Sequence, residues 1–233
     1  MNINELKKIT YEENLKLAKS GLVILTWGNV SIADRKLGVF AIKPSGVSYE
    51  KMKPEDMVIV SLKTGKKVSG KLNPSSDTPT HFELYKKFMY LNSIAHTHST
   101  FATAFAQAGK DIIPLGTTHA DTFYNAIPCV KKLSKKEIEG DYEANTGKAI
   151  IREFNKRDVC YLETPAVLLE SHGPFAWGKD ARDAVKNAIT LEAVAKMAFI
   201  TYSINPKVKK IDQYLSNKHY QRKHGKNAYY GQK

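Results

Sequence analysis

The sequence predicts an α/β fold of three layers, in which helices flank a mostly antiparallel central β-sheet. Two observations support this fold class. Short apolar segments joined by turn residues come in pairs over residues 30–42 and 57–69, which is typical of β-hairpins. Further along the chain, longer segments with apolar residues at helical spacing are interleaved with single strands. Hairpins favour antiparallel pairing, and the interleaved helices supply the outer layers.

The remaining elements follow in order along the chain. An opening helix is expected over residues 3–20, with Gly21 as its C-cap. After the two hairpins, helices are expected over 78–90 and 99–108, with a short strand around His96 and His98 between them. Short elements begin at residues 114–116. An amphipathic helix over 143–155, a strand over 166–171 and a long helix over 179–204 complete the prediction.

Size and composition indicate a single globular domain. The chain has 233 residues, of which 42% are hydrophobic, and no repeat or linker divides residues 1–233. The first residues lack the apolar core of a signal peptide, and no apolar run approaches the length of a membrane span. Cys129 and Cys160 have no CxxC spacing. We therefore expect a cytoplasmic protein with reduced thiols and no membrane partner.

The formal net charge of +13 raises the question of nucleic-acid binding. The lysines are dispersed, however, and no basic run is interleaved with stacking aromatic residues. A solvated lysine-rich surface explains most of the charge, and its field favours a phosphorylated metabolite. We expect no nucleic-acid partner.

Two histidines in one strand are the most informative feature. Side chains alternate between the faces of a strand, so His96 and His98 point the same way and can present two imidazoles to one divalent ion. His172 follows the apolar run 166–170 and precedes a glycine, which makes it a third candidate ligand. Taken alone, the pair could also be two polar strand residues that hydrogen-bond to backbone or water. Taken alone, His172 could be a core histidine whose hydrogen bonds are satisfied.

Seven short motifs occur along the chain: TWGNVS (26–31), KPSG (43–46), PSSDTPTH (74–81), HTHS (96–99), TTHAD (117–121), ESHGPF (170–175) and HGKNAYYGQ (224–232). Together they resemble the class II aldolase/adducin family from end to end. Within it, the SSD, HAD and YYGQ segments resemble the epimerase branch. The resemblance implies the class II aldolase-like fold and a homotetramer with active sites between subunits.

The resemblance also implies a metal site. It makes His96, His98 and His172 ligands of Zn²⁺, with Mn²⁺ or Co²⁺ as possible replacements, and puts Asp77 on the metal or beside it. Three neutral imidazoles leave the ion most of its charge, so it can act as a Lewis acid. Asp77 also precedes Thr78-Pro79, where it would suit a helix N-cap. Both roles can hold together.

The phosphate of a sugar-phosphate substrate is assigned by the resemblance to small residues at turns and to one lysine. Glycine lets backbone N–H groups approach an anion, serine hydroxyls add donors, and a helix N-terminus favours negative charge. Apart from the resemblance, such residues are ordinary turn chemistry. The substrate-binding candidates are Gly28, Asn29, Lys43, Ser45, Gly46, Ser75 and Ser76.

The implied reaction is inversion at C4 of L-ribulose 5-phosphate, giving D-xylulose 5-phosphate. The C3–C4 bond breaks in a retro-aldol step, because the carbanion formed is conjugated with the C2 carbonyl, and it then re-forms. The resemblance makes Asp121 and Tyr230 the acid/base pair, with His119 and His219 as secondary candidates. Without the resemblance, Asp121 would be interpreted as a helix cap and Tyr230 as a surface aromatic packed on a neighbour.

Two other functions are compatible with the same motifs. A related aldolase would release the fragments, and in fuculose-type relatives a glutamate takes the place of Asp77. A non-catalytic protein of the adducin type would be expected to lack the three histidines.

Overall fold

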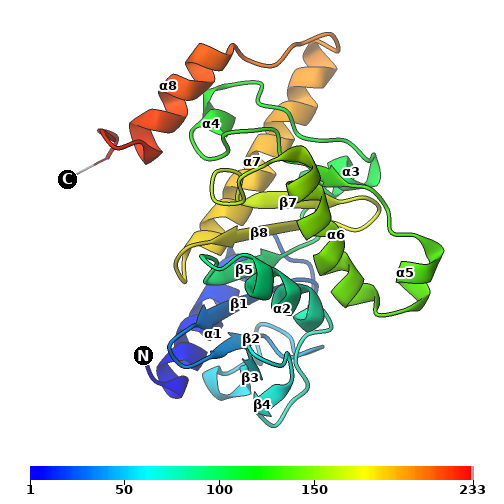
Figure 1. Ribbon diagram of the computed structural model, residues 1–233, viewed down its shortest axis with the longest axis vertical. Coiled ribbons are helices and arrows are strands. Elements are labelled where there is room, and N and C mark those ends of the chain that lie inside the picture. Colours follow the sequence, from blue (N-terminus) through cyan, green and yellow to red (C-terminus); the bar gives the residue numbers. More distant parts are fainter. Residues whose placement is uncertain (232–233) are drawn as a thin grey trace.

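The computed structural model describes residues 1–231, and a β-sheet runs through the middle of the molecule (Figure 1). Within these residues the sheet has eight strands in the order β4-β3-β2-β1-β5-β8-β7-β6. All neighbouring strands pair antiparallel except β6 and β7. The strands are β1 (Asn29–Asp34), β2 (Val39–Ile42), β3 (Val58–Ser61), β4 (Lys67–Ser69), β5 (Ser93–His96), β6 (Cys129–Val130), β7 (Ala166–Leu169) and β8 (Pro174–Gly178).

Helices cover both faces of the sheet. α1, α3 and α7 pack on one face and α2 and α6 on the other, with α4 and α8 together at one end of the molecule (Figure 1). The helices are α1 (Ile3–Lys19), α2 (Thr78–Lys87), α3 (Thr100–Gln107), α4 (Thr117–Ala120), α5 (Lys135–Glu139), α6 (Tyr142–Arg157), α7 (Asp183–Ile204) and α8 (Gln213–His224), with a 3₁₀ turn at Pro54–Asp56.

The alternation of side chains along the strands separates two hydrophobic cores. In β2, Val39 and Ala41 face the core under α1 and α7, whereas Phe40 and Ile42 face the core under α2 and α6. All four side chains are buried, because the sheet is covered on both faces. The predicted three-layer α/β fold with a mostly antiparallel sheet is therefore confirmed.

Most predicted elements are present with slightly different ends, and three differences are informative. The long helix begins at Asp183 rather than residue 179, because residues 179–182 form bends and a turn. The segment Pro174–Gly178 was not expected to be a strand, since it begins with proline and ends with glycine. α8 also escaped prediction, because it buries only Ser216 and Tyr220 and so lacks an apolar stripe. Among residues 1–231, no helix has the length and apolarity needed to span a membrane.

Candidate metal and sugar-phosphate site

Three histidines from two neighbouring segments meet at one point. His96 ends β5 and His98 follows it, while His172 lies in the turn between β7 and β8. β5 pairs with β8, and His96 stands opposite Phe175, so the β7–β8 turn lies beside the end of β5 and the two histidines there. One ring nitrogen from each histidine lies within 4.8 Å of the others, and Nε2 of His98 is 3.1 Å from Nε2 of His96.

The turn that carries His172 is sterically specialised. Ser171 has a positive φ of 64°, which is uncommon for a residue with a side chain. A Cβ at Gly173 would lie 2.8 Å from the carbonyl oxygen of Thr97. Glycine at 173 therefore lets the β7–β8 turn approach the segment that carries His98.

The protonation of these imidazoles suits a metal. The Nδ1–H of His96 donates a hydrogen bond to the carbonyl oxygen of Pro174 at 2.9 Å. In a neutral imidazole this leaves Nε2 without a proton, so that its lone pair can coordinate an ion. Burial, reinforced by the neighbouring His96, lowers the pKa of His172 to about 4. Burial likewise lowers the pKa of His98. Neutral imidazoles are the form that binds a divalent ion, so the donor set fits one.

Asp77 lies next to this cluster, at the start of α2. Its Oδ2 accepts a hydrogen bond from Nδ2 of Asn29 at 2.7 Å. Burial alone would raise the pKa of Asp77, but the nearby histidines and the Asn29 bond outweigh that effect and lower it. Asp77 occupies the expected N-cap position of α2, and its backbone carbonyl oxygen accepts the N–H of His81 at 3.1 Å. Its side chain makes no capping hydrogen bond to the helix. The carboxylate is ionised beside the histidines and remains available to a ligand.

All seven substrate-binding candidates line one cavity of about 440 Å³ beside the histidines. Turns at the ends of β1 and β2 and the start of α2 bring them together, and the buried His96 lies behind them. The lining of the cavity includes Gly28, Asn29, Lys43, Ser45, Gly46, Ser75, Ser76, Asp77, His98 and His172.

Lys43 is a buried cation in this lining, with 2% of its surface exposed. Its Nζ donates to the carbonyl oxygens of Val47 at 2.7 Å and Pro44 at 3.3 Å. Burial lowers its pKa to about 8. Across residues 1–231 no carboxylate lies within ion-pair distance of Lys43. A buried ammonium without an acidic partner is suited to an anionic ligand.

Two further cavity residues carry no sequence motif that marks them. Tyr142 and Glu143 begin α6 and line the cavity, and the Tyr142 hydroxyl oxygen lies 3.3 Å from Nδ1 of His172. Their contribution depends on the packing of α6 against α2, which the local sequence does not reveal. Trp27 also lines the cavity, and its indole is about half exposed at the rim.

A buried polar chain supports the cavity from behind. Nδ1 of His81 lies 2.7 Å from the hydroxyl oxygen of Ser31, which is also 2.8 Å from the hydroxyl oxygen of Tyr85. His81 is fully buried, and burial lowers its pKa to about 3. Asn29 and Ser31 lie on the same face of β1, so that face supports both Asp77 and His81.

Asp121 and Tyr230 lie outside this cavity. Asp121 follows α4, where its carboxylate pairs with Arg222 at 2.8 Å, His219 at 3.0 Å and Lys223 at 3.3 Å, all from α8. Tyr230 is 60% exposed, and the Arg222 guanidinium lies 4.9 Å from its ring centroid. Both residues contact Arg222 of α8, and α8 lies with α4 at one end of the molecule (Figure 1). Gln232 of the C-terminal motif lies outside the described residues.

His119 has a structural environment within α4. It is buried, and its Nε2–H donates to the carbonyl oxygen of Asn125 at 2.9 Å. Burial lowers its pKa to about 4. His219 differs, because it contacts Asp121 directly.

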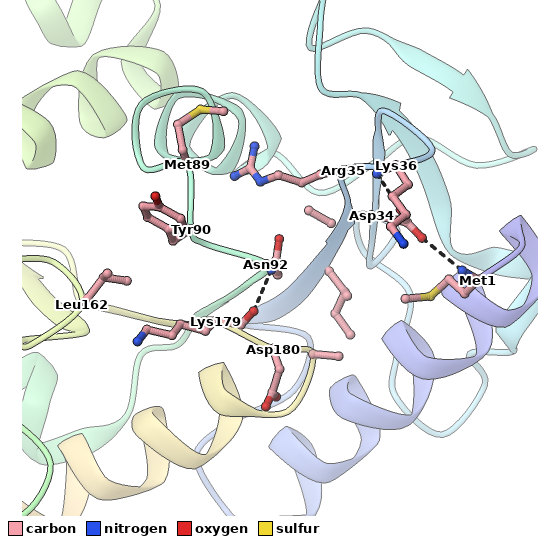
Figure 2. A pocket seen from close by; sticks show the side chains of 13 residues that line it. Met1, Asp34, Arg35, Lys36, Met89, Tyr90, Asn92, Leu162, Lys179 and Asp180 are labelled. Carbon is pink, nitrogen blue, oxygen red and sulfur yellow. Dashed lines mark hydrogen bonds and ion pairs between the residues drawn. The ribbon is translucent and has the colours of Figure 1, made fainter. Parts of the chain in front are cut away.

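A larger cavity of about 850 Å³ lies at the other end of β1 (Figure 2). The Arg35 guanidinium beside it donates to the carbonyl oxygens of Tyr85, Phe88 and Leu91. Arg35 therefore satisfies backbone groups at the end of α2. The lining holds no histidine and no cysteine.

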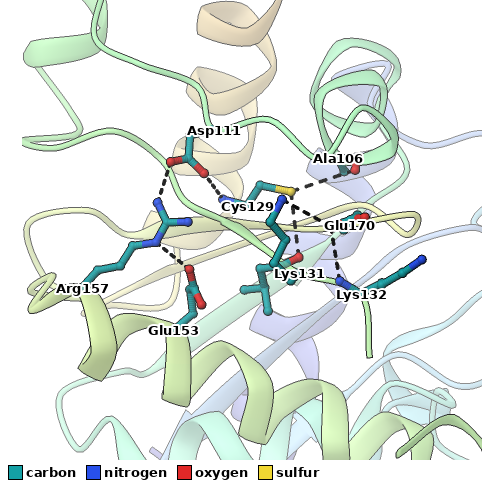
Figure 3. Close-up of polar contacts among 9 residues, drawn as sticks. Ala106, Asp111, Cys129, Lys131, Lys132, Glu153, Arg157 and Glu170 are labelled. Carbon is teal, nitrogen blue, oxygen red and sulfur yellow. Dashed lines mark hydrogen bonds and ion pairs between the residues drawn. The ribbon is translucent and has the colours of Figure 1, made fainter. Parts of the chain in front are cut away.

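The charged side chains around Cys129 pair with one another (Figure 3). The Arg157 guanidinium pairs with both Asp111 and Glu153, and the ammonium of Lys131 pairs with Glu170. Burial raises the pKa of Cys129 to about 12, which leaves a protonated, unreactive thiol. Cys129 and Cys160 are not joined in a disulfide.

Comparison with known proteins gives the same fold. An L-fuculose 1-phosphate aldolase structure is 22% identical, with a TM-score of 0.79 and coverage of 95% of this chain and 97% of that one. YgbL from Klebsiella pneumoniae is 21% identical, with a TM-score of 0.74 and coverage of 94% and 99%. L-fuculose-1-phosphate aldolase from Thermus thermophilus is 24% identical, with a TM-score of 0.66 and coverage of 88% and 98%.

A family model supplies the assignment that these structures leave open. The model for the class II aldolase and adducin N-terminal domain matches residues 10–199, most of the chain. The histidine cluster lies within the same residues. The chain therefore belongs to the class II aldolase and adducin family.

Proposed function

We propose that the protein is an L-ribulose-5-phosphate 4-epimerase, which interconverts L-ribulose 5-phosphate and D-xylulose 5-phosphate. One observation carries the proposal: three imidazoles converge beside a cavity that also holds a buried lysine, which has no acidic partner in the described part of the chain. This combination suits a substrate with oxygens for a metal and a phosphate for a cation. The SSD, HAD and YYGQ motifs favour the epimerase over its relatives.

His96, His98 and His172 would hold Zn²⁺, or Mn²⁺ or Co²⁺ in its place, with Asp77 beside it or as a further ligand. When bound, the ion supplies positive charge that stabilises negative charge on the substrate oxygens. Asn29 orients the Asp77 carboxylate through its 2.7 Å hydrogen bond.

The turn residues of the cavity would hold the phosphate. Ser75 and Ser76 precede α2, and Ser45 and Gly46 form the turn after Lys43. Their backbone N–H groups and hydroxyls supply hydrogen-bond donors, and the Lys43 ammonium supplies the charge. A volume of about 440 Å³ is within the usual range for small-molecule sites. The phosphate grip retains one fragment while the C3–C4 bond is broken.

The proposed reaction conserves protons and electrons. A base takes the proton of the C4 hydroxyl, the C3–C4 bond breaks, and its electron pair stays on C3 in conjugation with the C2 carbonyl. The aldehyde fragment turns over, the bond re-forms on its other face, and an acid returns a proton to the C4 oxygen. Asp121 and Tyr230 are the proposed acid/base pair, one for each face of the aldehyde.

The position of this pair supports a site shared between subunits. Asp121 and Tyr230 lie at the α4/α8 end and do not line the cavity of their own chain. We therefore propose a homotetramer in which the α4/α8 end of one subunit completes the cavity of the next.

The alternative is a class II aldolase acting on a related ketose phosphate. This chain shares its fold with two fuculose-phosphate aldolases, which favours this alternative. The two activities differ in whether the fragments leave, which depends on the grip on the phosphate rather than on the metal ligands.

A coupled assay on purified, metal-analysed protein tests the proposal. L-Ribulose 5-phosphate is supplied, and D-xylulose 5-phosphate and free glycolaldehyde phosphate are both measured before and after chelation. We expect metal-dependent formation of xylulose phosphate with little free fragment. Steady release of the fragment would assign the protein to the aldolases, and no turnover by metal-loaded protein would exclude this substrate.

A further inference from the structure

A tyrosine that belongs to no recognised motif lies beside a candidate metal ligand. Tyr142 lines the site cavity, and its hydroxyl oxygen is 3.3 Å from Nδ1 of His172. The two ring nitrogens of an imidazole are distinct, and a partner at Nδ1 determines whether Nε2 is free to bind an ion. The contact therefore acts on the tautomer and the orientation of His172.

His96 shows how such a contact works in the same site. Its Nδ1–H donates to the backbone carbonyl oxygen of Pro174 at 2.9 Å. Metal-binding histidines generally donate their second N–H to a partner, and loss of that partner weakens metal binding. For His96 the partner is main chain and cannot be removed by substitution. For His172 the partner is the side chain of Tyr142, which makes the contact testable.

The packing of α6 against α2 holds Tyr142 in place. A Cβ at Gly147 in α6 would lie 2.8 Å from Cβ of Glu83 in α2, so the glycine permits this close approach. The Thr80 hydroxyl donates to the carbonyl oxygen of Glu143 at 2.7 Å and ties the first turn of α6 to α2. Because Asp77 begins α2, Tyr142 has a defined position relative to the cavity.

We propose that Tyr142 is a positioning residue for the metal site. Its hydroxyl oxygen accepts the Nδ1–H of His172 and keeps that imidazole in the tautomer whose Nε2 binds the ion. This inference rests on the proposed function, because it requires that the histidine cluster binds a metal. It adds a residue from a third segment of the chain to those that build the site.

The test compares wild-type protein with Tyr142→Phe, which removes only the hydroxyl. Affinity for Zn²⁺ is measured by competition with a chromophoric chelator, and Co²⁺-loaded protein supplies an absorption spectrum. We expect Tyr142→Phe to bind Zn²⁺ about 10–100-fold more weakly and to change the Co²⁺ bands. Tyr90→Phe is the matched control, because it removes a hydroxyl from a side chain that is 68% exposed and outside the cavity.

The outcomes separate this inference from the proposed function. Equal Zn²⁺ affinity in wild-type and Tyr142→Phe proteins would overturn the role of Tyr142 and leave the metal site intact. Failure of wild-type protein to bind a stoichiometric ion would overturn both. Thermal unfolding of the metal-free proteins is the structural readout. A loss of stability in Tyr142→Phe that matches its loss of affinity would assign the hydroxyl to folding and overturn the positioning role.

Discussion

The histidine cavity and the α4/α8 end of the molecule handle charge in opposite ways. In the cavity, burial keeps imidazoles neutral, and the buried cation Lys43 has no acidic partner among residues 1–231. At the α4/α8 end, Asp121 already pairs with Arg222, His219 and Lys223. The first region is prepared for an ion and an anion from outside the chain, whereas the second satisfies its carboxylate internally.

The difference separates the two roles of the proposed site: the cavity holds the binding groups, and the α4/α8 end holds the proposed acid/base groups. Rigid strands and turns bring together the binding groups within one chain. Of the proposed acid/base groups, Asp121 follows the short helix α4 and Tyr230 lies beyond the end of α8, a helix that buries few side chains. In the proposed homotetramer another subunit covers this surface, so the predictions below treat the two regions separately.

The largest expected effect is the loss of a cavity histidine. His98→Asn removes one of three ligands, so bound metal should fall and epimerase activity should drop by at least about 10²–10³-fold, as when a group that stabilises an oxyanion is lost. Metal analysis and the coupled assay provide the measurements. His219→Asn is the control from the α4/α8 end and should retain the metal. Equal loss of metal in both variants would remove the distinction between the two regions.

Mixing variants tests whether the two regions meet between subunits. Asp121 and Tyr230 both contact Arg222 in the same chain, so one subunit would supply both to one site. Tyr230→Phe alone should lose about 10²–10⁴-fold in kcat. Co-refolding it with His98→Asn should restore about one quarter of wild-type activity, because a random assembly pairs intact halves in that share of sites. No recovery in mixed oligomers of confirmed composition would place each site within one chain.

Acid should destabilise the metal-free protein through its buried histidines. His119 has a folded pKa of about 4, below the unfolded value near 6.5. The unfolded chain therefore binds the proton first, and stability is lost as pH falls from about 6.5 to 4, by on the order of 3 kcal/mol. Urea unfolding across this range should show a shallower pH slope for His119→Gln. Identical slopes would show that His119 does not contribute.

Metal sharpens this test, because only one region should respond to it. Bound Zn²⁺ prevents protonation of His172 and so should remove the contribution of the cavity to acid sensitivity. The His119 contribution at α4 should remain. A pH slope abolished entirely by metal would contradict this separation.

The smallest effect concerns the helix contact behind Tyr142. Gly147→Ala adds a Cβ 2.8 Å from Cβ of Glu83 and 3.0 Å from the carbonyl oxygen of Thr80. The better helix propensity of alanine contributes about 1 kcal/mol, while overpacking costs about 1–3 kcal/mol. We expect a net loss of about 1 kcal/mol, measured by urea unfolding. A more stable variant would show that α6 can move away from α2 at little cost.

The sequence predicted the metal cluster better than the groups around it. His96 and His98 are two apart in the expected strand, and strand periodicity predicts that they point the same way. In the structure β5 ends at His96, and His98 directly follows it. Tyr142 and Glu143 reach the same cavity only because α6 packs on α2, which is a contact over a long sequence distance. No local sequence pattern marks the packing of α6 on α2, so neither residue was predicted to line the cavity.

Strand and helix prediction differed for a related reason. β2 is a continuous apolar run bounded by turn residues, and the opening helix α1 carries apolar residues at helical spacing, so the positions of both could be predicted from the sequence. β8 begins with proline and ends with glycine, and it is a strand because β5 and β7 pair with it on both sides. Asp77 occupies the N-cap position of α2 as expected, but its carboxylate accepts from the Asn29 side chain instead of capping the helix.

By itself, the sequence predicted the fold class, the three candidate histidines and the turn residues around the cavity, because each is marked by short-range periodicity or a contiguous motif. Only the tertiary structure decided that Lys43 is buried without a carboxylate, that Tyr142 contacts His172, and that Asp121 and Tyr230 lie away from the cavity. These properties depend on which distant segments pack together. Burial and charge environment arise from that packing and are not encoded at any single position.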